Sequence, residues 1–282
     1  MFAHEFVRNA FLAGTPIALA SGAIGYFVVL RVQVFAGDML SHVAFTGALA
    51  AAAAGIDLRL GLFAATVLVA ALLAALGDRA RADDVTIGVV FVGVLGLGVF
   101  FLDQFNRSAN GGNGSIASRT LFGSIFGLSH SAALLAAITG VGLLAAVAAI
   151  ARPLLYATIE PQVAASRGVP VSLLGAVFLI LLGVDAAEAT QAVGALLLLG
   201  LIAAPAGAAH KLTARPYLAL GLSCTIALGS VWAGLAAAYL IPTLPPSTAI
   251  LAVASGAYLL SFVVAGVSAA RIAGTMQHDV VH

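Results

Sequence analysis

The chain has 282 residues, of which 62% are hydrophobic and only 8% are charged, and its formal net charge is +1. Soluble globular domains are about 45–50% apolar and about a quarter charged, so this composition excludes a water-soluble fold. It predicts an all-α fold, a polytopic bundle of membrane-spanning helices that occupies residues 1–282 as one transmembrane domain. The near-neutral charge offers no basic surface for nucleic acid, and the single cysteine, Cys224, excludes an internal disulfide.

Membrane spans follow one another along the whole chain. A hydrocarbon core about 30 Å thick is crossed by about 20 apolar residues in a helix, and the sequence predicts eight or nine such spans. A polar loop, 103–118, interrupts the series and precedes a short apolar piece, 120–128, which we expect to be interfacial or re-entrant. The predicted spans are residues 10–30, 34–55, 60–76, 85–102, 131–150, 171–187, 192–209, 217–240 and 249–270.

Small residues indicate where these helices touch, because tight contacts in lipid form where side chains let two backbones approach. We expect contact faces at Gly93, Gly96 and Gly98 in one span and at Gly140 and Gly142 in the next.

The Lys and Arg residues set the expected orientation, because cytoplasmic loops carry the excess of positive charge. Placing the long connection 152–170 in the cytoplasm puts eight of the 12 Lys and Arg residues inside. This choice places the N-terminus outside and the C-terminal tail, 271–282, in the cytoplasm.

Asp38 and His42, in GDMLSH, are the clearest candidates for chemistry. Ionisable side chains inside spans are costly and usually mark function, and the i, i+4 spacing places both on one helix face. A carboxylate and an imidazole form half of a site for zinc, manganese or ferrous iron. The residues alone leave two alternatives open: an Asp–His hydrogen bond between helices, or an Asp that caps the second span.

The connection 152–170 is the second informative region. Glu160, Pro161, Ala164 and Gly168 form a pattern that predicts a short helix ended by Gly168. Such a helix suits docking on a cytoplasmic partner, although the residues alone favour an ordinary surface loop.

Three further residues are possible members of a pathway. Asp185 and Glu188 lie near the predicted outer end of the sixth span, where they either funnel cations or form the wet turn between two spans; the turn is favoured. Pro205 interrupts the seventh span and frees a carbonyl. That carbonyl is either a ligand or, as we expect more, part of a plain packing kink.

The other histidines are weaker candidates. His130 is expected at an interfacial helix start, and His210, beside Lys211, in a structural or phosphate-facing role. His278 and His282 belong to a tail that we expect to be frayed and solvated rather than metal-binding.

Two absences restrict the mechanism. The sequence contains no G-x-x-x-x-G-K-[ST] motif and no H-E-x-x-H motif, so we predict no ATPase or metalloprotease activity of its own. Two functions then remain: a permease driven by a separate ATPase, and a self-sufficient secondary transporter of divalent cations coupled to protons.

Several segments, in order, resemble the zinc/manganese/iron-type ABC permeases. The GD…H and VGALL…P segments are quite specific in combination, and the matches cover most of the chain. The segments are FAGDMLSHVAFTGALAAAAAG (35–55), TIGVVFVGVLGLGV (86–99), TLFGSIFGLS (120–129), EPQVAASRGVPV (160–171), AVGALLLLGLIAAPAGAA (192–209) and PPSTAI (245–250).

The resemblance implies the fold of a type II ABC importer permease in the bacterial cytoplasmic membrane. It implies that Asp38 and His42 coordinate the transported metal, with no permanently bound cofactor. It also implies that 152–170 contains the coupling helix for an ATPase subunit. The expected partners are a second copy of the permease, the cytoplasmic ATPase and an extracytoplasmic metal-binding protein.

Overall fold

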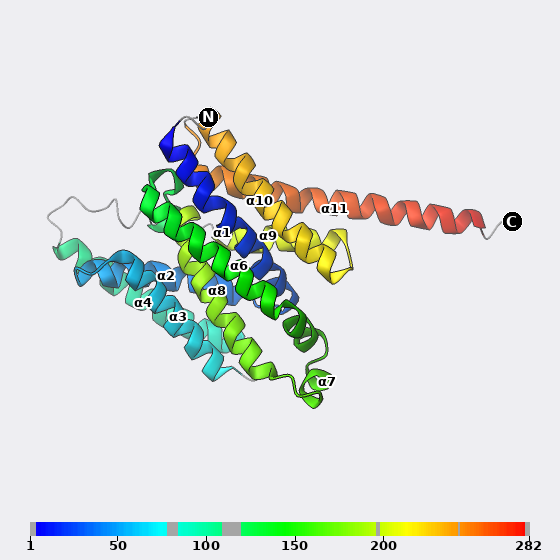
Figure 1. The fold of residues 1–282 in the computed structure, drawn as a ribbon, viewed down its shortest axis with the longest axis horizontal. Coiled ribbons are helices and arrows are strands. Elements are labelled where there is room, and N and C mark those ends of the chain that lie inside the picture. Colours follow the sequence, from blue (N-terminus) through cyan, green and yellow to red (C-terminus); the bar gives the residue numbers. More distant parts are fainter. Residues whose placement is uncertain (1–3, 78–83, 109–119, 196–197, 242, 280–282) are drawn as a thin grey trace.

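A computed structural model describes residues 4–77, 84–108, 120–195, 198–241 and 243–279. Within these ranges the regular structure is helical throughout, as the composition predicts (Figure 1). The elements are α1 (Glu5–Leu30), α2 (Val34–Ala53), α3 (Leu58–Leu76), α4 (Asp84–Ser108), η1 (Ile125–Gly127), α6 (His130–Ile159), α7 (Pro161–Ser166), α8 (Val171–Val193), α9 (Leu198–Leu212), α10 (Pro216–Leu240) and α11 (Pro246–Asp279).

Eight of the described helices are long and apolar enough to cross a membrane, namely α1 to α4, α6, α8, α10 and α11. Helix α9 has only 15 residues, fewer than the roughly 20 that a straight span requires. The prediction of eight or nine spans is therefore confirmed, with α9 as the shortened ninth helix.

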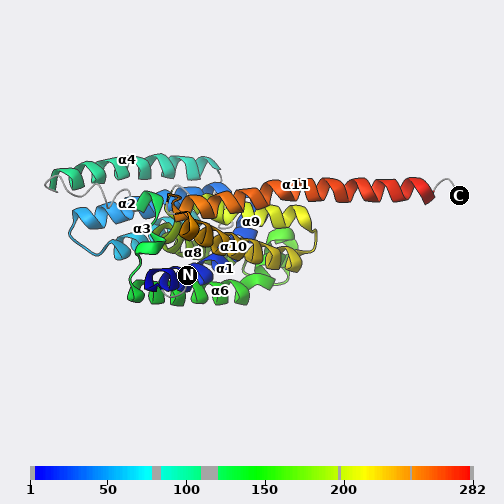
Figure 2. The same cartoon turned by 90° about the horizontal axis from the view of Figure 1, so that it is seen from above.

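Helices α1 and α8 lie at the centre of the bundle. Helix α1 packs against α6, α9 and α10, whereas α8 packs against α2, α3 and α6. Helix α4 lies at the edge, where it packs on α2 and forms an outer layer in Figure 2. Val85, Val89 and Val92 of α4 are 70–73% exposed, which suits a surface dissolved in lipid.

Close backbone contacts hold the central helices together. A Cβ added at Gly47 of α2 would overlap the backbone of Gly61 in α3, and the reverse also holds. A Cβ at Gly25 of α1 would likewise overlap the backbone of Ile202 in α9. These helices approach so closely because glycine has no side chain at the crossing points.

The glycines predicted as contact faces divide into two groups. Gly98 meets the Thr46 side chain, and Gly140 meets the backbone of α1 near Pro16. At Gly93, Gly96 and Gly142 a Cβ would meet nothing within 4 Å among the described residues, so these three glycines form no helix contact inside the described chain.

The boundary between α8 and α9 differs from the prediction. Helix α8 continues to Val193 instead of ending near residue 187, and the chain turns at Gly194, where φ is +99°. Asp185 and Glu188 are therefore inside a helix, so the interpretation of these acids as a wet turn between two spans is wrong. The turn occurs at Gly194 because this φ is one that residues with a Cβ rarely adopt.

The predicted apolar piece 120–128 packs against this turn. Ala195 N donates a hydrogen bond to Thr120 O over 3.1 Å, and Ser124 N donates one to Gln191 O over 3.3 Å. Gly123 (φ +74°) has no room for a Cβ, which would lie 2.5 Å from Val193 C. The segment therefore closes the end of α8 with backbone hydrogen bonds.

Helix α11 is longer than the predicted span. Its backbone is helical to Asp279, so the expectation of a frayed tail over QHDVVH (277–282) is wrong as far as Asp279, a stretch that includes His278. His282 lies outside the described residues. Figures 1 and 2 both show α11 projecting beyond the rest of the bundle.

Candidate metal pathway

Asp38 and His42 lie on α2, where Asp38 follows the helix start at Val34 by one turn. Both side chains are half-buried. The His42 ring centroid lies 5.2 Å from that of Phe91 on α4, and Ser41 Oγ donates to the backbone oxygen of Asp38 over 2.6 Å. The pair thus lies where α2 meets α4.

Neither alternative interpretation of the pair fits this geometry. Asp38 is inside α2, whose N-cap residue is Gln33, so Asp38 does not cap the helix. Among the described residues, neither the Asp38 carboxylate nor the His42 imidazole makes a hydrogen bond. The two side chains are therefore free to bind a ligand.

The described chain does not complete a metal site by itself. Nowhere in the described ranges do three or more His, Cys, Asp or Glu side chains gather in a way that could hold a metal ion. The remaining ligands of an ion at Asp38 and His42 would therefore be water, backbone carbonyl groups or groups of another molecule.

Helix α8 runs beside the part of α2 that carries the pair. A Cβ at Gly37 of α2 would lie 3.8 Å from Leu182, and Ala187 clusters with Ala44 and Ala48. The residues of α8 that face α2 are thus small or aliphatic, at the level of Asp38 and His42.

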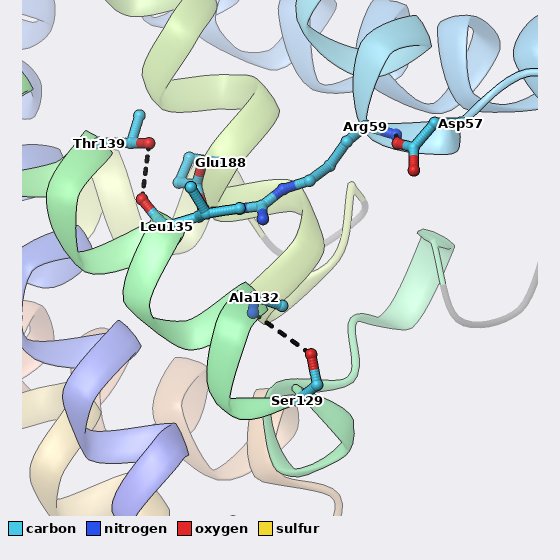
Figure 3. Close-up of polar contacts among 7 residues, drawn as sticks. All are labelled: Asp57, Arg59, Ser129, Ala132, Leu135, Thr139 and Glu188. Carbon is cyan, nitrogen blue, oxygen red and sulfur yellow. Dashed lines mark hydrogen bonds and ion pairs between the residues drawn. The ribbon is translucent and has the colours of Figure 1, made fainter.

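Asp185 and Glu188 are deeply buried, each with 1% of its surface exposed. Asp185 Oδ1 accepts a hydrogen bond from Ser21 Oγ of α1 over 3.0 Å. Glu188 Oε1 lies 3.0 Å from Arg59 Nη2 of α3, and Figure 3 shows the Arg59 side chain extending from the start of α3 towards Glu188. The acids face α1 and α3, so the structure does not bring them together with Asp38 and His42.

Sequence reasoning missed the role of Arg59, which it counted only as a cation on the outer side. The available signal was one arginine at the start of a span in a chain that also carries two acids within a span, since such charges tend to pair. The sequence could not identify Glu188 as the partner of Arg59, because 129 positions separate the two residues.

Pro205 lies inside α9 and is buried. It has no N–H for the carbonyl of Leu201, so that carbonyl lacks its ordinary helical donor. Beside α9 is a groove of about 510 Å³, and one of its lining residues is Val34, one turn before Asp38. The groove is lined by Val29, Val34, Leu199, Gly200, Ala203, Ala204, Gly207, Leu251 and Tyr258, and therefore not by Pro205.

The expected short helix is present as α7. Pro161 is its first residue, and its N-cap residue, Glu160, is exposed. At the other end Gly168 has φ +80°, and Val169 N donates to Ala164 O over 3.0 Å, which is the hydrogen bond of a Schellman C-cap. Ala164 is fully buried, so it anchors α7 to the bundle and is not on the surface that a partner would meet.

His210 and His130 have structural contacts within the described chain. The His210 ring stacks on Tyr26, with centroids 4.8 Å apart and 7° between the planes, and its Nε2 lies 3.2 Å from Tyr26 O. His130 is the first residue of α6, as predicted, and its Nδ1 lies 3.2 Å from Asn9 Oδ1.

Comparison with known proteins supports a transport function. The ABC 3 transport family matches residues 3–265. The chain belongs to this family. It is therefore a multi-pass membrane permease of an ABC transport system.

Individual members of the family are distant relatives. The chain is 26% identical over 265 residues to "Manganese transport system membrane protein MntC" of Halalkalibacterium halodurans, covering 93% of this chain and 88% of that protein. It is 27% identical over 207 residues to "Manganese import system permease protein ScaB" of Streptococcus parasanguinis, covering 73% and 72%. It is 25% identical over 210 residues to "Probable iron transport system membrane protein" of Haemophilus influenzae, covering 74% and 75%.

A solved structure has the same fold. A chain of "PsaBC from Streptococcus pneumoniae in complex with Fab" matches with a TM-score of 0.78, covering 92% of this chain and 91% of that chain. The sequences are 22% identical, so this match shows the fold alone.

Proposed function

We propose that the chain is the permease subunit of an ATP-driven importer of divalent transition-metal ions, and that Mn²⁺ is its substrate. The observation that carries this proposal is the Asp38–His42 pair. A carboxylate and an imidazole face one direction from a membrane helix and have no hydrogen-bond partner among the described residues. Relatives named as manganese permeases support the choice of Mn²⁺.

The chemistry of the pair suits a divalent transition-metal ion. One carboxylate oxygen and one imidazole nitrogen are acceptable ligands for Mn²⁺, Fe²⁺ and Zn²⁺. The described residues offer no third His, Cys, Asp or Glu ligand beside the pair. We propose that the permease is a homodimer in which the second copy contributes its own Asp38 and His42 to one pathway.

The energy comes from a separate ATPase subunit in this proposal. The sequence has no phosphate-binding motif of its own, and α7 presents an exposed surface that includes Gln162 and Ala165. These two residues also line a groove of about 670 Å³ between α7 and the start of α8. The ATPase docks on this surface, and an extracytoplasmic metal-binding protein delivers the ion to the opposite side.

The direct test is uptake of radioactive Mn²⁺ by proteoliposomes that contain the permease, its ATPase and its binding protein. Asp38→Asn and His42→Gln each remove a ligand at nearly constant volume. We expect uptake to fall about tenfold or more, since even the outer partners of a metal ligand affect affinity by about 10–100-fold. The matched control is His4→Gln, at the exposed histidine that precedes α1.

The same system separates the alternatives. Wild-type uptake by a correctly folded Asp38→Asn or His42→Gln variant would refute the pathway. If unlabelled Fe²⁺ or Zn²⁺ inhibits the uptake more strongly than unlabelled Mn²⁺ does, that ion is the substrate instead of Mn²⁺. Uptake driven by a proton gradient in liposomes without the ATPase would instead support a self-sufficient carrier.

A further inference from the structure

The transport proposal does not use a buried acidic centre where α1, α3 and α8 meet. Asp185 and Glu188 are one turn apart on α8, and each is 1% exposed. Asp185 bonds to Ser21 of α1, and Glu188 pairs with Arg59 of α3. Of the two acids at this depth, Glu188 has a cation as its partner and Asp185 has a neutral hydroxyl.

The two acids differ in how their charge is compensated. Glu188 has a guanidinium 3.0 Å away, whereas the hydrogen bond that the Asp185 carboxyl group accepts within the described chain comes from a neutral hydroxyl. Asp185 Oδ2 is buried and has no hydrogen-bond partner in the described chain. An ionised carboxylate in that position is costly, and an isolated buried acid binds a proton instead of keeping its charge.

No described cation forms a hydrogen bond or an ion pair with Asp185. On α1 the neighbour is Ser21, and the face of α8 towards α2 contacts Gly37, Ala44 and Ala48. Arg59 is the cation from α3, and it is bonded to Glu188. Among the described residues, the other ionisable groups on the elements packed against α8 form no hydrogen bond or ion pair with Asp185; they are Glu5, Arg8 and Tyr26 on α1, Asp38 and His42 on α2, His130, Arg152 and Tyr156 on α6, His210 and Lys211 on α9, and Tyr258 on α11. Arg31, which follows α1, lies over the ring of Phe178.

A metal ion does not fit this centre as well as a proton does. A metal requires several converging ligands, and the described residues include no cluster of three or more His, Cys, Asp or Glu side chains that could hold one. A proton requires a single oxygen, and Asp185 Oδ2 is an unpartnered one.

We propose that Asp185 is a proton-binding site, a carboxylic acid that keeps its proton well above the pH at which an exposed aspartate ionises, while Glu188 stays ionised beside Arg59. The site lies on α8 between Leu182 and Ala187, at the level of the Asp38–His42 pair, but it faces α1 instead of α2. The inference uses burial and pairing only, so it does not depend on the transported ion.

Infrared spectroscopy of the full chain in lipid tests this assignment directly. A protonated carboxyl group has a C=O band separate from the carboxylate and amide bands, and the band shifts in D₂O. At pH 6, where exposed carboxyl groups are ionised, we expect the wild type to show one such band that Asp185→Asn removes. Glu188→Gln and the exposed control Asp57→Asn should both keep it.

A stability measurement provides a second readout. Asn resembles a neutral carboxylic acid in shape, so Asp185→Asn should approach the wild-type thermal midpoint below about pH 4, where Asp185 is neutral in the unfolded chain as well. As the pH rises above this range, the wild type should lose stability because Asp185 gives up its proton in the unfolded chain but keeps it in the folded protein, whereas Asp185→Asn should lose less. A wild-type spectrum without a band that depends on Asp185 would overturn the proposal, and so would equal loss of stability in both proteins.

Discussion

Arg59 Nη2 of α3 lies 3.0 Å from Glu188 Oε1 of α8 and joins two helices across 129 positions of sequence. The Glu188 side chain is 2% exposed and the Arg59 side chain is 23% exposed. The two partners are therefore unequal, because Arg59 reaches solvent and Glu188 does not.

This inequality predicts the order of stability of the variants. Arg59→Met leaves a buried carboxylate without its cation and should lower the free energy of unfolding by on the order of 3 kcal/mol. Glu188→Gln should have a smaller effect, because Arg59 remains partly hydrated. Thermal unfolding in nanodiscs measures both.

The double variant Arg59→Met/Glu188→Leu is the control for this pair. Replacing both partners of a buried ion pair by apolar residues is often nearly neutral, so the double variant should be more stable than Arg59→Met alone. If Arg59→Met is as stable as the wild type, the pair does not hold α3 to α8.

Gly61 gives a second prediction, about packing near the candidate pathway. A methyl group at Gly61 would overlap the backbone of Gly47 on α2, the helix that carries Asp38 and His42. Gly61→Ala should therefore push α3 away from α2 and lower stability by about 1–3 kcal/mol. The matched control is Gly142→Ala, where a Cβ meets nothing within 4 Å; equal thermal midpoints for the two variants would contradict the contact.

Gly168 gives a third prediction, about coupling to an ATPase. Nothing lies within 4 Å of a Cβ at this position, so only its φ of +80° restricts the residue. Gly168→Val should distort the end of α7 and reduce stimulation of ATPase activity by the permease, because a β-branched residue rarely adopts this φ. Gly168→Asn should keep most of the stimulation, since Asn tolerates left-handed backbone.

The thermal midpoint and the stimulation of ATPase activity should both be measured for these Gly168 variants. Val at this position should leave the thermal midpoint of the membrane bundle nearly unchanged, because the affected residues are exposed. Full ATPase stimulation by the Val variant would show that α7 does not transmit the signal.

His210 gives a fourth prediction, about which histidines bind metal. Its ring stacks on Tyr26, so His210→Phe should preserve the stack and the uptake of Mn²⁺. His210→Ala should lower stability by about 1 kcal/mol or more, since stacked aromatic pairs contribute about 0.5–1.5 kcal/mol beyond their buried area. Loss of uptake in a stable His210→Phe variant would contradict a purely structural role.

Local patterns explain which parts of the site were predictable. The Asp38–His42 spacing and the Gly168 helix end depend on residues within one or two turns of each other, so the sequence alone indicates both. The sequence predicts a turn at Asp185 and Glu188, because acids near the end of an apolar stretch usually mark one. Their partners, Ser21 and Arg59, are 164 and 129 positions away.

The sequence by itself determined that this protein is a bundle of eight or nine membrane helices. Lipid offers no hydrogen bonds to the backbone, so a long apolar chain must satisfy its own groups within helices. Only the tertiary structure decided which polar groups meet, because these contacts depend on how helices far apart in sequence pack. It showed that Asp38 and His42 on α2 make no side-chain hydrogen bond among the described residues, whereas Asp185 and Glu188 on α8 do. It also showed that α8 ends at Gly194 and not at the acids.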